Sequence, residues 1–229
     1  LSERLACFDV FWFSTFPTFL AQNCVSTNRE KKLFPFLSML TVRTITSDAA
    51  GTLMRPRPSV GAIYAETVRE RGYEAEDGDV NQRFHRVFAE TQSRKVNFLG
   101  DERGFWRMVV GRTVEGLCPP EIHDSLFEEL WETFANGKSW RLADGAVETL
   151  RVLRERGYRL AILSNNDSRL HTILNDLGAT ELFEHLFISS EIGHEKPSKK
   201  IFREVERVLR TSPDDMLHLG DSRSRDVDG

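Results

Sequence analysis

An acidic residue that follows a short β-branched run is the first position in this chain whose type and setting could support chemistry. Residues 44–47 lead into Asp48, and the small residues at 49–52 follow it. In open α/β sheets, ligands bind outside the carboxyl ends of the strands, where Asp48 is expected to lie. Because positions 49–51 are Ala, Ala and Gly, an ion or a substrate can approach the backbone closely. Asp48 is therefore the centre of a candidate site.

Three other strand ends carry residues of matching chemistry. Ser164 and Asn165 end an apolar run, Lys196 lies in the loop after another strand, and Asp221 follows a third. The carboxyl ends of parallel strands gather along one edge of a sheet, so these side chains and Asp48 are expected to face a single pocket.

Carboxylates beside a lysine form a site for a divalent cation and an anionic substrate. Hard oxygen ligands favour Mg²⁺, which keeps several waters and bridges carboxylates to phosphate groups. An ionised carboxylate next to such a cation can attack phosphorus and form an aspartyl-phosphate. A hydroxyl and an ammonium group would then neutralise charge on the transferred group.

The elements that must position these residues alternate between strands and helices. Strands are predicted over 40–48, 158–163, 186–189 and 216–220, with helices over 144–156, 168–177 and 199–210. Ser198 is expected to cap the last of these helices. This alternation predicts an α/β fold with a doubly wound parallel sheet.

An all-helical block separates the first strand from the others. Residues 59–136 show four apolar patterns at helical spacing, and their aromatic residues are expected to form a core rather than a binding site. The run from Arg55 to Pro58 is expected to break regular structure and act as a linker. We therefore expect a Rossmann-like core over 39–54 and 141–229, a helical cap over 55–140, and an N-terminal extension over 1–38 outside the fold.

The composition argues against several classes of partner. The formal net charge is −4, so no basic field is expected to attract nucleic acid or an anionic membrane. The uncharged stretch 10–28 contains Pro17 and several polar residues, which makes it a poor membrane span. The three cysteines are scattered and are read as reduced thiols of a cytoplasmic protein. The sequence does not predict an oligomeric state.

The four strand-end segments resemble, in order, the four motifs of the haloacid dehalogenase-like (HAD) hydrolase superfamily. Positions 48–52 are similar to motif I, Ser164-Asn165 to motif II, Lys196 to motif III, and 220–222 with Asp226 to motif IV. The resemblance covers residues 40–229, and the helical block matches the α-helical cap of the subfamily that places its cap after motif I. The cap opening at 59–64 is similar to that of the hydrolase domain-containing protein 3 group.

The resemblance implies a Mg²⁺ site with four contributors. Asp48 would be both nucleophile and metal ligand, and Ala50 would lend its backbone carbonyl to the metal. Asp221 would be a further ligand, and Asp226 either a ligand or a residue that orients the others.

It also implies a binding site for the phosphoryl group of a small phosphorylated substrate. Ser164 would contact a phosphoryl oxygen, and Lys196 would hold Asp48 and the phosphate together. Thr52 would orient the nucleophile, and the backbone N–H of Asn165 would meet a phosphate oxygen.

One position departs from the phosphatase pattern. The phosphatases of this superfamily have a second Asp two residues after the nucleophile, and Ala50 stands there instead. Loss of a general acid/base typically costs about 10²- to 10⁴-fold in rate. The leading interpretation is a Mg²⁺-dependent phosphatase that is slow or restricted in substrate.

Two alternatives stay open. One is another hydrolase of the superfamily, acting on haloacids or phosphonates; the phosphonate version needs a cap lysine, for which Lys95 is the candidate. The other is a catalytically silent module that binds a phosphorylated ligand or protein. Gly229 closely follows Asp226, so the C-terminal part of the core, a helix and a strand in similar proteins, is expected to be missing.

Overall fold

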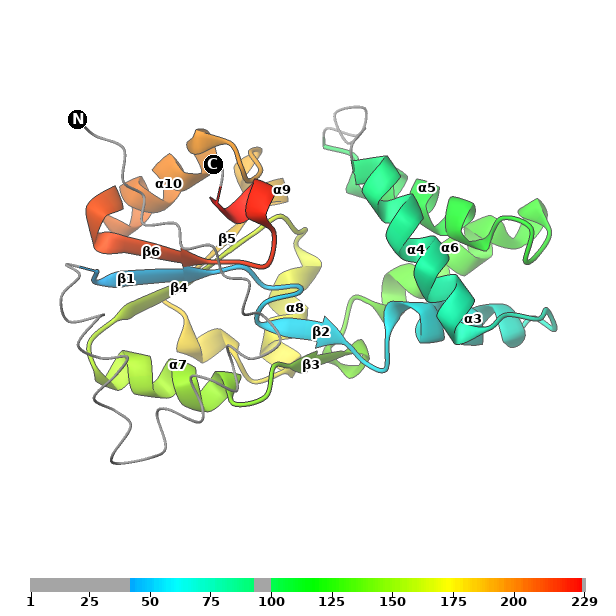
Figure 1. The fold of residues 1–229 in the computed structure, drawn as a ribbon, viewed down its shortest axis with the longest axis horizontal. Coiled ribbons are helices and arrows are strands. Elements are labelled where there is room, and N and C mark those ends of the chain that lie inside the picture. The colour runs from blue at the N-terminus through cyan, green and yellow to red at the C-terminus, as the bar shows by residue number, and fades with distance from the viewer. Residues whose placement is uncertain (1–41, 93–99, 228–229) are drawn as a thin grey trace. The chain divides into compact units, whose positions relative to one another are not determined.

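The structure is a computed structural model that describes residues 42–92 and 100–227 (Figure 1). The described residues form two compact units. One unit is Pro56–Arg141, and the other contains the described residues up to Arg55 and from Leu142 onward. The extension expected over 1–38 lies outside the described residues.

A parallel sheet forms the centre of the first unit. Its strands are β1 (Thr44–Ser47), β4 (Arg159–Ser164), β5 (His185–Ile188) and β6 (Met216–Leu219), in the order β5-β4-β1-β6. All three pairings are parallel, and Thr44 lies opposite both Arg159 and Met216. The predicted α/β fold with a parallel sheet is confirmed, and β1, which leads into Asp48, occupies an inner position.

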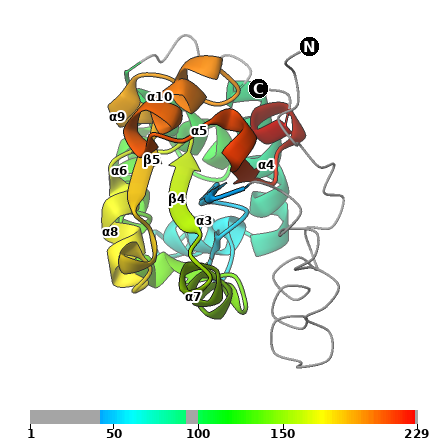
Figure 2. The ribbon, with the colours of Figure 1, turned by 90° about the vertical axis from the view of Figure 1, so that its left-hand side faces the viewer.

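Helices cover both faces of this sheet. In Figures 1 and 2, α10 (Lys199–Leu209) lies on one side and α7 (Ala146–Glu155) on the other, with α8 (Arg169–Asp176) on the side of α7. Ile201, Phe202 and Val205 of α10 pack with Ala161 and Leu163 of β4, which alternate with side chains of the opposite face. The predicted cap on α10 is present, because the Ser198 hydroxyl accepts a hydrogen bond from the N–H of Lys200.

Short turns complete the connections between these elements. They are α9 (Ser189–Ile192), the 3₁₀ turns Thr180–Leu182 and Pro213–Asp215, and a π-helical turn, Arg223–Val227. The loop from α9 to α10 carries Lys196, and the π-helical turn carries Asp226.

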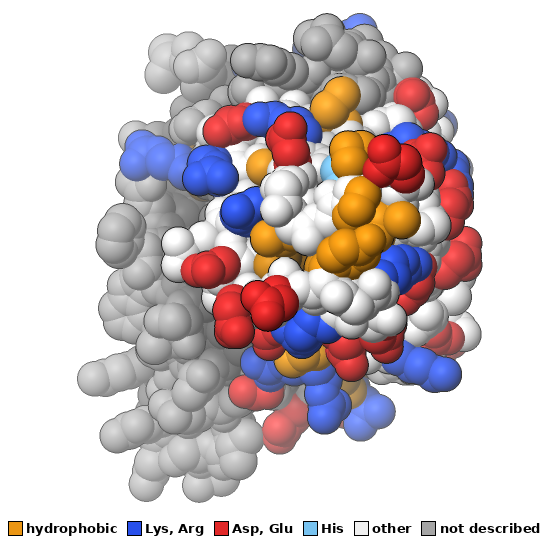
Figure 3. Space-filling view, turned by 90° about the vertical axis from the view of Figure 1, so that its right-hand side faces the viewer, with side chains coloured by type: hydrophobic (Ala, Val, Ile, Leu, Met, Phe, Trp, Pro, Cys, Tyr) orange, Lys and Arg blue, Asp and Glu red, His pale blue; other side chains and the backbone are white. Residues whose placement is uncertain are grey.

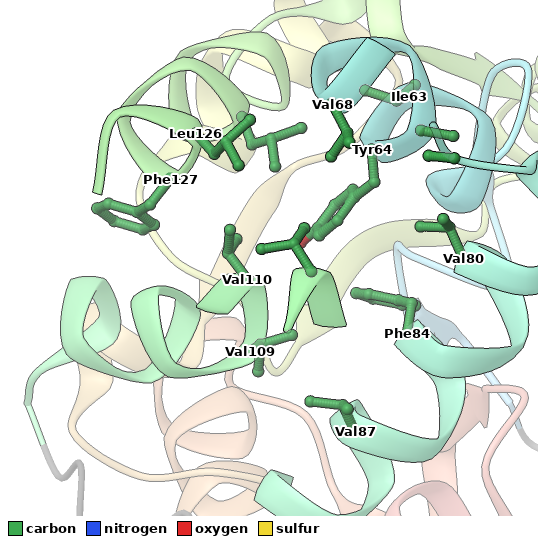
Figure 4. Close-up of a cluster of buried hydrophobic side chains, with 14 of the residues drawn as sticks. Ile63, Tyr64, Val68, Val80, Phe84, Val87, Val109, Val110, Leu126 and Phe127 are labelled. Atoms are coloured by element: carbon green, nitrogen blue, oxygen red, sulfur yellow. The ribbon is translucent and has the colours of Figure 1, made fainter. Parts of the chain in front are cut away.

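The second unit is helical, as its sequence pattern indicates. Its helices are α3 (Val60–Arg69), α4 (Asp77–Gln92), α5 (Glu102–Val114) and α6 (His123–Thr133), with 3₁₀ turns at Pro120–Ile122 and Gly137–Ser139. Tyr64, Phe84, Val109 and Leu126, one from each helix, point into a shared interior (Figure 4). The expectation that its aromatic and apolar side chains form a core is confirmed, because Phe105 and Phe127 are also buried there.

The expectation of an irregular linker at Arg55–Pro58 was wrong in part. Strand β2 (Met54–Pro56) pairs with β3 (Trp140–Leu142) in a two-stranded ribbon. Pro56 is tolerated because a two-stranded ribbon has only edge strands, where an N–H can be dispensed with. The chain therefore leaves the first unit and returns to it along paired strands.

The described surface is mixed in character. Figure 3 shows one face on which hydrophobic side chains gather among Lys, Arg, Asp and Glu. Among the described residues, no helix is both long enough and apolar enough to cross a membrane. Cys118 is a free, buried thiol whose pKa is raised by burial, whereas Cys7 and Cys24 lie outside the described residues.

Candidate active site

The ends of the parallel strands bring the candidate residues of the first unit together. Asp48 follows β1, Ser164 is the last residue of β4, and Asp221 follows β6. Lys196 and Asp226 reach the same place from the two loops described above, and both are buried. The edge of the sheet thus positions groups that lie more than a hundred residues apart in the chain.

Asp48 is held from several sides. It is 7% exposed, and its Oδ1 accepts hydrogen bonds from the backbone N–H of Ala49 and from the Ser164 hydroxyl, both at 2.7 Å. Its Oδ2 lies 3.2 Å from the Lys196 ammonium group. Charged groups buried in this way are stable only when they are paired and hydrogen-bonded, as Asp48 is. Its carboxylate is therefore fixed in orientation.

Lys196 joins two carboxylates. Its Nζ donates a hydrogen bond of 2.7 Å to Oδ1 of Asp226, in addition to its contact with Asp48, and its side chain is 1% exposed. Burial alone would raise the pKa of Asp226, but hydrogen bonds from His218, Lys196 and the Ser222 N–H together lower that pKa. Asp226 is therefore a carboxylate whose negative charge the surrounding donors stabilise.

His218 is a member of this network that the sequence analysis did not identify. Its Nε2 lies 3.1 Å from Oδ1 of Asp226, and its Nδ1 lies 2.9 Å from the Thr46 hydroxyl. Burial lowers the pKa of His218 more than the neighbouring carboxylate raises it, which favours a neutral ring. A neutral ring that donates from Nε2 to Asp226 accepts at Nδ1 from Thr46. The only signal in the sequence was a histidine in the otherwise apolar strand β6.

Asn165 positions Lys196 through the main chain. Its side-chain amide donates to the carbonyl of Lys196 and accepts from the N–H of the same residue, both at 2.8 Å. The side chain of Asn165 thus satisfies both backbone polar groups of Lys196, in the way that a neighbouring strand would.

The acidic residues fit a divalent cation. Asp48, Asp221 and Asp226 each offer a carboxylate oxygen, and these oxygens lie within 4.8 Å of one another. Partial burial, and then the negative charges of Asp48 and Asp226, raise the pKa of Asp221 despite the opposing charge of Arg225, so the negative charges outweigh the positive one there. Three oxygen donors with excess negative charge match the preference of Mg²⁺. Asp226 is also occupied by the hydrogen bonds described above, which suits a residue that orients the others.

Two glycines leave the space that these carboxylates occupy. A Cβ on Gly51, whose φ is +93°, would lie 2.4 Å from Oδ2 of Asp221. A Cβ on Gly220 would lie 2.0 Å from Cγ of Asp226. Any side chain at either position would displace a carboxylate.

Ala50 and Thr52 are predicted site residues that form no side-chain hydrogen bond with Asp48. Ala50 is exposed and pairs with Met54 in an isolated bridge, and its own side chain offers no carboxyl group. The Thr52 hydroxyl oxygen is buried and has no hydrogen-bond partner among the described residues, Asp48 included. Lys95, the candidate cap lysine, lies outside the described residues.

Sequence comparison decides the family. A family model described as haloacid dehalogenase-like hydrolase matches residues 42–229. The human protein named haloacid dehalogenase-like hydrolase domain-containing protein 3 is 34% identical over 197 residues, which covers 83% of this chain and 78% of the human protein. The chain belongs to the haloacid dehalogenase-like hydrolases. The resemblance inferred from the four motifs is therefore confirmed.

Solved structures of HAD-like proteins share the fold. A magnesium-bound HAD-hydrolase of Bacillus subtilis, YfnB, superimposes with a TM-score of 0.64 and 20% identity over 82% of this chain and 83% of its own. The L-2-haloacid dehalogenase of Xanthobacter autotrophicus has a TM-score of 0.57 and 21% identity, over 77% and 69%. Because HAD-like folds of different chemistry match at similar levels, the reaction must be argued from the residues of the site.

Proposed function

We propose that this HAD-like hydrolase is a Mg²⁺-dependent phosphatase that acts on a small phosphorylated molecule through an aspartyl-phosphate at Asp48. The observation that carries the proposal is the fixed Asp48 carboxylate, oriented by Ser164 and Lys196 beside two further carboxylates. Displacement of a halide from a haloacid does not require three clustered carboxylates. Binding of a divalent cation together with a phosphate group does require such a cluster.

The proposed reaction has two displacements at phosphorus. A carboxylate oxygen of Asp48 attacks the phosphorus, and the bond from phosphorus to the substrate oxygen breaks, releasing an alkoxide or phenoxide. Water then attacks the phosphorus of the aspartyl-phosphate, the bond to Asp48 breaks, and phosphate and a proton are released. Lys196 and the Ser164 hydroxyl are placed to neutralise or hydrogen-bond the phosphoryl oxygens in both steps.

A bound Mg²⁺, held by Asp48, Asp221, Asp226 and the Ala50 carbonyl, would supply further positive charge for the phosphoryl oxygens. Ala50 offers no proton to the leaving oxygen. The chain should therefore favour esters whose leaving groups depart without protonation, such as aryl phosphates.

Phosphate release from an aryl ester and an alkyl ester, with and without Mg²⁺, tests this proposal. The wild-type chain is compared with Asp48→Asn and Ala50→Asp, and circular dichroism confirms that each variant folds. We expect Mg²⁺-dependent release from the aryl ester, and at least a ~10³-fold loss in Asp48→Asn. Ala50→Asp should extend release to the alkyl ester, by about 10²- to 10⁴-fold.

Two results would overturn the phosphatase proposal. One is a folded wild-type chain that releases phosphate from neither ester, which would favour the silent binding module. The other is an Asp48→Asn variant as active as the wild type, which would place the reaction elsewhere.

A further inference from the structure

A groove with a cavity volume of about 630 Å³ lies beside the free edge of β5, between that strand, α9 and α10. Figure 2 shows β5 at the outer edge of the sheet, with α9 and α10 next to it. We call this the β5 groove. None of its lining residues belongs to the acidic cluster around Asp48. Its volume falls in the range of about 300–1,000 Å³ that is typical of small-molecule sites.

The β5 groove has an apolar lining from the strand and from α9. Leu186 and Ile192 line it and are partly exposed, and the buried ring of Phe187 lies against that of His185 with 4.3 Å between the centroids. An apolar surface of this kind favours a ligand with a hydrocarbon or aromatic portion.

The charged residues of the β5 groove leave an excess of positive charge. Glu204 forms an ion pair with Arg207, which leaves one acid, Glu191, 2.9 Å from the ring of His171, against two cations. Lys200 and Arg203 also line the groove, and neither the Lys200 ammonium group nor the Arg203 guanidinium forms a hydrogen bond or ion pair with a described residue. These two cations stand one helical turn apart on α10, in a chain whose formal net charge is −4.

We propose that the β5 groove is a second binding site, for a small organic anion that joins a carboxylate, sulfonate or phosphate to an apolar body. The anionic group would contact Lys200 and Arg203, and the apolar body would cover Leu186 and Ile192. The ligand is a small molecule because the groove combines a volume of that scale with a compact pair of cations. The proposal is independent of the chemistry at Asp48.

Naphthalene-2-sulfonate is the probe that tests the β5 groove, with the uncharged naphthalene-2-sulfonamide as its matched neutral control. Both are titrated into the full chain and followed by ¹H–¹⁵N NMR. We expect the sulfonate to shift the amides of β5, α9 and the first turns of α10, with a dissociation constant on the order of 1 mM or below. The sulfonamide should bind about tenfold more weakly, because it cannot form ion pairs.

Two double variants with the same net charge distinguish binding by the groove cations from a general effect of net charge. Lys200→Gln with Arg203→Gln should weaken sulfonate binding by about tenfold. Lys199→Gln with Arg151→Gln removes two exposed cations that do not line the groove, and should change binding less than about twofold.

Five outcomes would overturn the proposal. Equal binding by both double variants, or equal binding of the two probes, would remove the role of Lys200 and Arg203. Shifts confined to Asp48, Lys196 and their neighbours would place the anion in the acidic cluster instead. No shifts at all would leave the groove without a ligand of this class. Amides of β5 that shift with protein concentration alone would assign the groove to a second copy of the chain.

Discussion

The acidic cluster at the sheet edge and the interior of the helical unit are both buried, but they are held by different interactions. In the helical unit, apolar side chains such as Val109 and Leu126 are fully buried and pack without directional bonds. At the sheet edge, Asp48, Lys196 and Asp226 are nearly as buried, and each is fixed by hydrogen bonds or ion pairs. Packing tolerates substitution by side chains of similar volume, whereas buried charges require specific partners.

The largest expected effect comes from removing the shared cation of the cluster. Lys196→Met should lower the free energy of unfolding by about 3–5 kcal/mol, because Asp48 and Asp226 would remain buried without it. Thermal unfolding with and without Mg²⁺ measures this loss, and Mg²⁺ should recover part of it. Lys199→Met, at an exposed position on α10, is the control and should change stability by less than about 0.5 kcal/mol. Equal melting temperatures for the two variants would contradict the buried-charge account.

A truncation in the helical unit should be costly, and its cost relative to the wild type should not depend on metal. Leu126 is 0% exposed, so Leu126→Ala should lower the free energy of unfolding by about 2–4 kcal/mol through lost contacts and a cavity. Leu126→Met conserves volume and should cost less than about 1.5 kcal/mol. The same thermal measurements apply: Mg²⁺ should stabilise Leu126→Ala no more than it stabilises the wild type, and a larger gain in Leu126→Ala would break the distinction between the two regions.

Two glycine substitutions separate backbone strain from displacement of a carboxylate. Gly51 and Gly116 both have positive φ, at +93° and +75°, but only a Cβ on Gly51 would meet a neighbour, Asp221. Each change to Ala should cost about 1 kcal/mol of stability. Gly51→Ala should in addition weaken Mg²⁺ binding by about tenfold, as measured by calorimetry, because a bound ion needs Asp221 in place. A similar loss of Mg²⁺ affinity in Gly116→Ala would show that the effect is not local.

The smallest expected effect concerns an exposed ion pair, Arg159 with Glu184, in the unit that contains the parallel sheet. Arg159 donates to Glu184 at 2.8 Å and 2.5 Å, and this hydrogen bonding lowers the pKa of Glu184 from its ordinary 4.5. Glu184→Gln should cost only about 0.2–1 kcal/mol at neutral pH. Because the folded pKa is the lower one, the wild-type advantage should be present above pH 4.5 and disappear as the pH falls below it.

Urea unfolding of the wild type and Glu184→Gln from pH 7 down through the acid range measures that difference. Glu155→Gln removes an exposed acid of α7 and serves as the control. A cost in Glu184→Gln as large as that in Lys196→Met would show that burial does not set the strength of these pairs.

Most of the parallel sheet could be predicted, because short apolar or β-branched runs alternate with helical patterns along the chain. Asp48, Ser164 and Asp221 lie at or just after the ends of three of these runs, and the helical unit followed from its apolar period. The ribbon of β2 and β3 could not be predicted, since Pro56 argues against a strand unless the edge position is known.

The role of His218 could not be predicted for a related reason. His218 lies opposite Thr46 in the register of β1 and β6, and it contacts Asp226 only because the π-helical turn returns the chain to the strand end. A sequence shows that these residues are polar, but it does not show which strands are neighbours.

The amide of Asn165 has a consequence for how this site could change over time. It holds the N–H and the carbonyl of Lys196, a pair that every residue except proline possesses, and its hydrogen bonds to this residue go to the main chain. The position of the loop thus depends on the main chain of residue 196, whereas the functional group depends on its side chain. A new side chain at position 196 would arrive at the same place beside Asp48, so the loop could present a different basic group, which the buried Asp48 and Asp226 still require, without a change in the backbone.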